Sequence, residues 1–359
     1  MRAALRRGRG RPRPGCRAGR AADRARPAPR GDRRAGDRGG AVSSASEEPI
    51  SPETLVDFLR SVRIGLQDGL DPTAATERAV EALPDRLGEA VETIVNRLRG
   101  EYDEDEWGFD EQFAEAVFPL FEFLYDVWWR VETEGARNVP GHGRALLVAN
   151  HAGSLFPFDA AMATTAIMRE HPLPRWPRFM VLDWAFSLPF VSSFMRRAGG
   201  VPASSSNAAR LLEEEELVMA FPEGAAGTGK PFSERYRLRR FGRGGFAEIA
   251  LRTGAPIVPV AIVGAEETYP KLAESQTLAR AVGAPFVPIT PTFPWLGLLG
   301  LVPLPSRWRI DFCEPIDLSE HPPDAADDRR LVLDLSERVR ETIQAKLYES
   351  LVKRRSTFL

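Results

Sequence analysis

Five short apolar runs recur along the chain, and segments with helical spacing separate them. The runs read ALLVA, RFMVL, LVMAF, PIVPVAIVG and WRIDFC. A strand that is covered on both faces reads as a continuous apolar run, and parallel strands need long crossovers between them. The helix-like segments 157–170, 206–216 and 244–253 lie between the runs, where those crossovers belong. The alternation therefore predicts an α/β fold with a mainly parallel sheet covered by helices on both faces.

Changes in composition divide the chain into three regions. Residues 1–46 are rich in Arg, Pro and Gly, have almost nothing to bury, and are predicted to be a disordered tail. Residues 47–108 are predicted to be a helical N-terminal extension, because the sequence SPE at 51–53 is typical of a helix start. Residues 109–359 are predicted to be the main domain, which ends in a long amphipathic helix. The acidic stretch EYDEDEWGFDE, residues 101–111, lies where these two regions meet and is predicted to be a solvated connector.

Charge is divided unevenly along the chain. Residues 1–40 carry 14 Arg and 3 Asp and so a net charge of +11, which leaves −13 for the rest of a chain whose net charge is −2. An acidic body disfavours nucleic acid as a partner. Three readings of the basic tail stay open: a disordered end, a translation start assigned too far upstream, or an arm that binds anionic lipid.

Two further features concern the compartment. The two cysteines, Cys16 and Cys313, lie in regions of opposite character, which disfavours a disulfide framework and favours a reducing compartment. No run of about 18 apolar residues is present, so no transmembrane helix is expected. The tail also lacks the apolar core of a secretory signal.

Polar residues end two of the predicted strands. Asn150 and His151 follow ALLVA, and the sequence FPEG at 221–224 follows LVMA. The carboxyl ends of parallel strands form the functional edge of an open sheet, so these residues are expected to gather there.

His151 and Asp159 are candidates for a base and its orienting acid. A neutral imidazole accepts a proton more readily when a carboxylate fixes its tautomer and stabilises the imidazolium. Asp159 falls in the first turn of a helix that begins near Pro157, and Gly153 would let the loop fold back toward the histidine. The alternative is a strand-end histidine beside an unrelated helix acid.

Missing motifs narrow the chemistry. The chain has no G-x-S-x-G elbow, no His, Cys and carboxylate cluster at metal-ligand spacing, and no glycine fingerprint for nucleotides. Ser154 lies close to His151, but nothing marks it as a strained nucleophile. A histidine base without a protein nucleophile suggests direct transfer, in which the base activates a substrate hydroxyl that attacks an activated acyl group.

Three motifs in order carry a resemblance to a known family. VANHAGSLFPFDAA, MAFPEGAAGTGKPF and APIVPVAIVGAEETY, with the lead-in YDVWWRVETEGARNVP, resemble the glycerolipid acyltransferases of the PlsC type across about residues 113–318. The resemblance implies acyl transfer from acyl-CoA or acyl-ACP to a lysolipid hydroxyl, with His151 as base and Asp159 as its partner. It also implies an acceptor site at the FPEG motif and needs no metal or redox cofactor. The acceptor-site residues are Phe221, Pro222, Glu223 and Gly224.

Two departures from the family pattern leave questions open. The family spacing is His-x4-Asp, whereas this chain has His-x7-Asp. The second block, RRAGGVPASSSNAARLL, lacks the arginine signature of members that use glycerol phosphates. Arg196, Arg197 or the arginines of segment 235–243 are candidates to replace it, and Arg240 and Arg243 are predicted to bind anionic substrate groups. The acceptor stays open among lysophosphatidic acid, another lysolipid, and a neutral alcohol such as diacylglycerol. Two rival functions are a lipid esterase using Ser154 and a lipid-binding protein without turnover.

Two apolar segments suggest a membrane surface. The segment TPTFPWLGLLGLVPLP, residues 290–305, is predicted to dip into a bilayer through Trp295, Leu298 and Leu299, or else to be a buried connection. The aromatic segment 113–129 is predicted to pack on the core, with or without a second contact to lipid. The chain is therefore expected to work as a peripheral enzyme on the cytoplasmic face of a membrane.

Overall fold

The computed structural model of the 359-residue chain describes residues 52–70, 72–80, 104–152, 156–187, 191–282, 287–354 and 356–358. All of these residues belong to one compact unit, Glu48–Leu359. The predicted tail, residues 1–46, and Cys16 lie outside the described residues.

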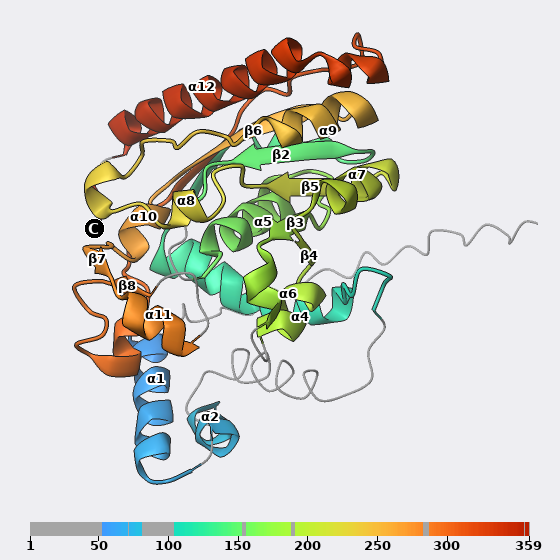
Figure 1. Cartoon of the computed structure of the whole chain (residues 1–359). Coiled ribbons are helices and arrows are strands. Elements are labelled where there is room, and N and C mark those ends of the chain that lie inside the picture. Colours follow the sequence, from blue (N-terminus) through green and yellow to red (C-terminus); the bar gives the residue numbers. More distant parts are fainter. Residues whose placement is uncertain are drawn as a thin grey trace, which may run out of the picture. The chain divides into compact units, whose positions relative to one another are not determined.

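The described residues form a seven-stranded sheet in the order β1-β9-β6-β2-β5-β3-β4 (Figure 1). Strands β2 to β6 run parallel, whereas β9 is antiparallel to β6 and β1 is parallel to β9. The five apolar runs are β2, β3, β5, β6 and β9, so the prediction of a mainly parallel α/β sheet is confirmed. In chain order the strands are β1 (Glu132–Glu134), β2 (Ala145–Ala149), β3 (Arg178–Val181), β4 (Gly200–Pro202), β5 (Leu217–Ala220), β6 (Ile257–Val263) and β9 (Arg309–Phe312), and a separate pair is β7 (Ala273–Glu274) with β8 (Pro288–Ile289).

Helices cover both faces of the sheet. One face carries α4 (Glu111–Phe123), the π-helix η1 (Leu124–Trp128), α5 (Phe158–Glu170) and α6 (Val191–Arg197). The other face carries α7 (Ser205–Glu213), α9 (Gly245–Thr253) and α12 (Arg329–Lys353) (Figure 1). The remaining helices are α1 (Pro52–Gln67), α2 (Pro72–Val80), α8 (Ala225–Thr228), α10 (Ala265–Thr268) and α11 (Gln276–Val282), with short 3-10 turns η2 (Ala136–Asn138), η3 (Asp183–Ser187), η4 (Phe232–Glu234), η5 (Gly297–Leu301) and η6 (Pro323–Asp327).

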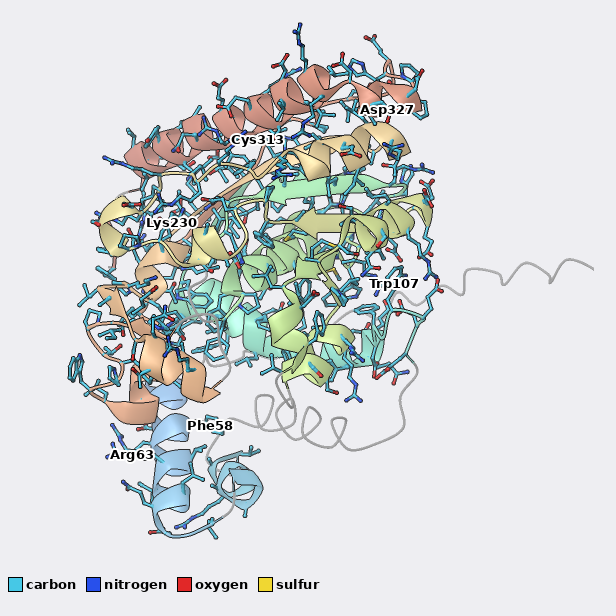
Figure 2. The ribbon with its side chains drawn as sticks, viewed as in Figure 1. Phe58, Arg63, Trp107, Lys230, Cys313 and Asp327 are labelled. Atoms are coloured by element: carbon cyan, nitrogen blue, oxygen red, sulfur yellow. The ribbon has the colours of Figure 1, made fainter. Side chains whose placement is uncertain are left out.

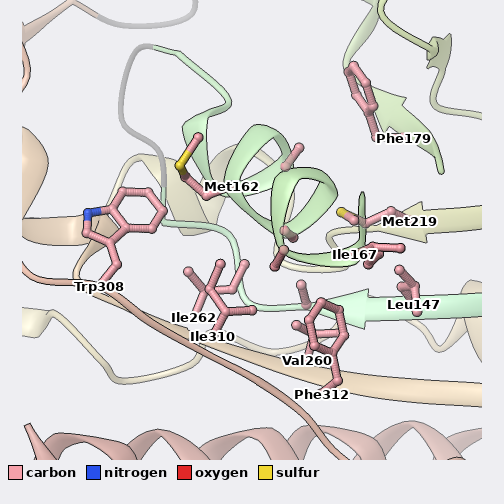
Figure 3. Close-up of a cluster of buried hydrophobic side chains, with 14 of the residues drawn as sticks. Leu147, Met162, Ile167, Phe179, Met219, Val260, Ile262, Trp308, Ile310 and Phe312 are labelled. Atoms are coloured by element: carbon pink, nitrogen blue, oxygen red, sulfur yellow. The ribbon is translucent and has the colours of Figure 1, made fainter. Parts of the chain in front are cut away.

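Alternate residues of β2 enter two separate cores, which explains why the strand reads as an unbroken apolar run. Leu147 packs with Met162 and Ile167 of α5 (Figure 3), whereas Leu146 and Val148 pack on the opposite face. All of these side chains are buried. A strand with both faces covered has no polar side.

The aromatic segment 113–129 packs on the first of these cores. Trp129 stacks on Trp308 with ring centroids 4.7 Å apart. The indole nitrogens of Trp128 and Trp129 donate to the carbonyl oxygens of Pro303 and Leu304, at 3.0 Å in each case. The end of the apolar segment 290–305 is therefore fixed to the domain.

The acidic stretch before α4 is more than the solvated connector that its composition predicted. Asp105 pairs with Arg178, whose side chain is almost buried and lies 4.3 Å from the ring of Phe109. Glu104 pairs with Arg197 at 2.9 Å. The indole N–H of Trp107 (Figure 2) donates to the carboxylate of Glu214. The acids are exposed, but their arginine partners come from distant elements and so could not be read from the local sequence.

Candidate active site

Neighbouring strands bring the two polar strand ends together. In the parallel pair of β2 and β5, Val148 lies opposite Ala220. The chain then leaves both strands at the same edge, and the His151 N–H donates to Glu223 Oε1 at 3.1 Å. Asn150 ties the end of β2 to its other neighbour, β6, because its side-chain amide forms hydrogen bonds with both the N–H and the carbonyl of Ile262. Asn150 was expected at this edge, but its bonds to Ile262 were not predicted.

His151 and Asp159 contact each other across the longer spacing. His151 Nδ1 lies 2.7 Å from Asp159 Oδ2, and the Asp159 side chain is completely buried. The same oxygen accepts the Ala152 N–H at 3.0 Å, and Oδ1 accepts the Ala160 N–H at 2.9 Å. Two backbone donors and the first turn of α5 favour the ionised carboxylate.

The histidine ring is held on a second side by Phe221. The two ring centroids are 4.6 Å apart and the planes are tilted by 31°. The His151 side chain remains 14% exposed. Since Nδ1 is engaged with Asp159, Nε2 is the ring nitrogen that is left to meet a substrate.

His151 lines a cavity of about 670 Å³ that is mostly apolar. Side chains from β3, α5, α6, α7, α9, β5 and the loop after β5 contribute to its wall, among them Ala160, Phe179, Val181, Val191, Met195, Ala208, Phe221, Phe246 and Ile249. Ser204, Ser205, Thr228 and Arg243 are its polar members besides His151 among the described residues.

Two glycines after β5 let the loops approach. Gly224 has φ +54° and ψ −146°, a conformation that L side chains rarely adopt. A Cβ at Gly227 would lie 2.7 Å from Glu223 Cβ and 2.9 Å from the His151 carbonyl oxygen. Gly227 was not predicted as a site residue, and only its place after the FPEG motif could have drawn attention to it.

Glu223 lies beneath the histidine rather than in the cavity. Its side chain has 0% exposure, and Oε2 accepts the Arg239 N–H at 2.7 Å. Lys230 approaches the same oxygen at 3.3 Å and lies 2.8 Å from Glu266 Oε1. Burial raises the pKa of Glu266, and Lys230 partly offsets this effect. The acceptor contact predicted for Glu223 stays a prediction.

The other predicted site residues are dispersed. Phe221, Pro222 and Gly224 line the cavity, as does the exposed Arg243. Arg240 is also exposed but does not belong to the cavity wall. Trp295 is exposed and Leu299 is half-buried, whereas Ser154, Gly153 and the side chain of Leu298 lie outside what the structure describes.

Neither a metal-binding cluster nor a membrane-spanning helix is present in the described ranges. No three His, Cys, Asp or Glu side chains there are placed to hold a metal ion. No helix there is both long and apolar enough to cross a bilayer.

Known proteins resemble this chain in sequence, and one solved structure was matched as well. Residues 130–263 match the family model described as Acyltransferase. An uncharacterized protein of Mycobacterium tuberculosis is 48% identical over 289 residues, which is 79% of this chain and 80% of that protein. One of Mycobacterium leprae is 48% identical over 284 residues, covering 79% and 77%. The crystal structure of the 1-acyl-sn-glycerophosphate acyltransferase PlsC from Thermotoga maritima has a TM-score of 0.46 at 20% identity, covering 74% of this chain and 90% of that one.

The family match spans the part of the chain that builds the site. It begins just before β1 and ends with β6, so it contains both the His151–Asp159 pair and the FPEG motif. The chain therefore belongs to the acyltransferase family, as the resemblance of its three motifs to glycerolipid acyltransferases of the PlsC type predicted.

Proposed function

We propose that this glycerolipid acyltransferase moves a fatty acyl chain from an acyl thioester to a hydroxyl of a lysophospholipid or related acceptor, with His151 as general base. One observation carries the proposal: a histidine with a buried carboxylate on Nδ1 borders an apolar cavity of about 670 Å³. The pair supplies a base, and the cavity supplies a place for an acyl chain beside it.

The chemistry follows from these groups. His151 Nε2 takes the proton of the acceptor hydroxyl while the hydroxyl oxygen attacks the thioester carbonyl carbon. The new C–O bond forms, the C–S bond breaks, and the proton passes from the imidazolium to the leaving sulfur. Asp159, held by two backbone N–H groups, keeps the tautomer and stabilises the imidazolium.

The rim of the cavity favours an anionic carrier on the donor. Arg243 lines the cavity, and Arg235, Arg237, Arg239 and Arg240 are exposed on the same segment. Guanidinium groups suit the phosphates of acyl-CoA, and they suit an acidic acyl carrier protein as well. Acyl-CoA and acyl-ACP are therefore the two donors to compare.

A direct assay tests the reaction. Labelled acyl-CoA or acyl-ACP is incubated with a panel of lysolipids and neutral alcohols, diacylglycerol included. A labelled lipid product that requires both donor and acceptor supports acyl transfer. Free fatty acid released without any acceptor, and lost in a Ser154→Ala variant, would instead indicate the esterase. If neither the labelled lipid nor free fatty acid forms with any combination of donor and acceptor, the protein would be a lipid-binding protein without turnover.

The cavity predicts a dependence on chain length. Ala208 lines the cavity, so Ala208→Phe would fill part of the space that a long acyl chain occupies. Each methylene that loses its apolar site costs about 0.8 kcal/mol, so the preference for hexadecanoyl over decanoyl donors should fall at least about tenfold. The measurement is kcat/KM for both donors. Ala345→Phe, on the exposed face of α12, is the matched control and should keep the wild-type preference. An unchanged preference in Ala208→Phe would mean that the acyl chain lies elsewhere.

Membrane docking is proposed through the apolar loop. Trp295 is 73% exposed and Leu296 is 54% exposed, and both line a groove with Arg63 (Figure 2) and Gln67 of α1. Large exposed apolar side chains beside a basic one suit a lipid surface. The chain would then act as a peripheral enzyme on the cytoplasmic face.

Removing this surface should release the protein from lipid. Each side chain gains about 1.5 to 3 kcal/mol at full burial, so the Trp295→Ser/Leu296→Ser variant should bind liposomes at least about tenfold more weakly. Sedimentation with liposomes measures this. Leu173→Ser is the matched control, because Leu173 is 58% exposed near the opposite end of α5 from Asp159. Turnover of a short, water-soluble acceptor should survive. Equal sedimentation of the double variant and the control would place attachment on another surface.

A further inference from the structure

We infer that Lys230 is a positioning residue for His151, acting through Glu223, and this inference rests on the proposed role of His151 as base. Lys230 lies in the loop between α8 and η4 (Figure 2) and is only 3% exposed. A lysine is rarely buried unless it is paired. Its burial therefore depends on the partners of its ammonium group.

The ammonium group joins two buried carboxylates. Lys230 Nζ lies 3.3 Å from Glu223 Oε2 and 2.8 Å from Glu266 Oε1. It also donates to the Arg237 carbonyl oxygen at 3.3 Å. Two carboxylates and one ammonium leave the cluster with one net negative charge. Without the ammonium, two like charges would face each other away from water, which is strongly unfavourable.

Each carboxylate in turn holds backbone that forms the site. Glu223 Oε1 accepts the His151 N–H, and Oε2 accepts the Arg239 N–H. Glu266 accepts the Tyr236 N–H. Lys230 thus fixes the carboxylate that holds the histidine backbone, and also the start of the arginine segment that borders the cavity. Lys230, Glu223 and Glu266 do not line the cavity that His151 borders, so the role is one of positioning.

Replacement of the ammonium should have a pH-dependent effect that a lysine with only a structural role would not show. In Lys230→Met, one buried carboxylate must take up a proton to relieve the repulsion. Below its raised pKa the cluster keeps one negative charge, as in the wild type; above it the cluster carries two and the carboxylates separate. The ratio of variant to wild-type kcat should therefore fall as pH rises.

The neighbouring ionisable groups are common to both proteins. A control that removes a neighbouring ammonium instead separates their effect from that of Lys230. These groups are His151, Arg235, Tyr236, Tyr269 and Lys271, with Glu267 and Arg354 behind Tyr236.

The expected result is a loss in kcat that depends on pH. A displacement of the base by about 1 Å costs about 100-fold, so Lys230→Met should lose about 10- to 100-fold in kcat at alkaline pH, with a smaller loss at mildly acidic pH. The KM for the donor should change little. The melting temperature of the variant should also fall with rising pH more steeply than that of the wild type, and this readout needs no activity.

A second substitution restores the charge balance and keeps the test decisive. In Lys230→Met/Glu266→Gln the cluster again carries one negative charge, so most of the lost kcat should return and the ratio should become independent of pH. Lys271→Met is the matched control, because Lys271 is also buried and lines the same small pocket but pairs with Glu274 at 2.8 Å. It should lack the pH-dependent loss.

Three outcomes would overturn the role of Lys230. They are a Lys230→Met ratio that is flat with pH, a double variant no better than the single one, and an equal loss in Lys271→Met. If His151→Ala keeps its activity, the proposed function fails first, whatever Lys230 does. If His151→Ala is inactive and the Lys230 pattern is absent, only the inference on Lys230 fails.

Discussion

His151→Ala should lower the rate of acyl transfer by about 10² to 10⁴-fold, the usual contribution of a general base. The imidazole is the ionisable side chain that both lines the cavity and contacts a buried carboxylate among the described residues. Its removal leaves the acceptor hydroxyl without a group to take its proton. The backbone N–H that binds Glu223 is kept in the alanine variant, so the loops should hold their positions.

The experiment is a single-turnover rate with labelled donor, together with a thermal melt. His142→Ala is the matched control, because His142 is an exposed histidine on the approach to β2. The control should react like the wild type. A folded His151→Ala protein that keeps most of the wild-type rate would rule out the mechanism, whereas loss of the fold would call for His151→Asn or His151→Gln instead.

The sheet could be predicted because strands that are buried on both faces consist almost entirely of apolar residues. The strands β2 and β6 are covered on both faces, so every residue of either strand is buried and the runs are unbroken. The antiparallel direction of β9 was not predicted. The apolar pattern of WRIDFC fits a parallel and an antiparallel strand equally well. The long connection after β6 determines the direction in which β9 pairs with β6. Strand periodicity carries no information on direction.

The site was predictable where its residues are close in sequence or follow the carboxyl ends of neighbouring parallel strands. His151 and Asp159 are eight positions apart, and the loop between a strand and a helix limits where the acid can go. Lys230 is a different case, because lysines are usually exposed and nothing local marks this one. Its burial depends on Glu223 and Glu266, which come from segments after β5 and β6. Tertiary packing brings Glu223 and Glu266 to Lys230, and no local sequence pattern indicates this.

Asp159→Asn should keep the fold and lower kcat by about 10² to 10⁴-fold, because an amide carries no charge to stabilise the imidazolium. Asp159 Oδ2 receives His151 Nδ1 and the Ala152 N–H, whereas Oδ1 receives the Ala160 N–H. An asparagine with its oxygen at the Oδ2 position keeps the tautomer but turns its NH₂ toward the Ala160 donor.

The opposite orientation is worse for catalysis. The NH₂ would then face the Ala152 N–H and donate to Nδ1, so the proton would move to Nε2 and the base would be blocked. Either orientation leaves one backbone donor unpaired, which costs about 1 to 3 kcal/mol of stability and should appear as a lower melting temperature. Asp126→Asn is the matched control, since Asp126 is an exposed partner of Arg169. Wild-type kcat in a folded Asp159→Asn protein would show that the carboxylate holds the loop but does not take part in the reaction.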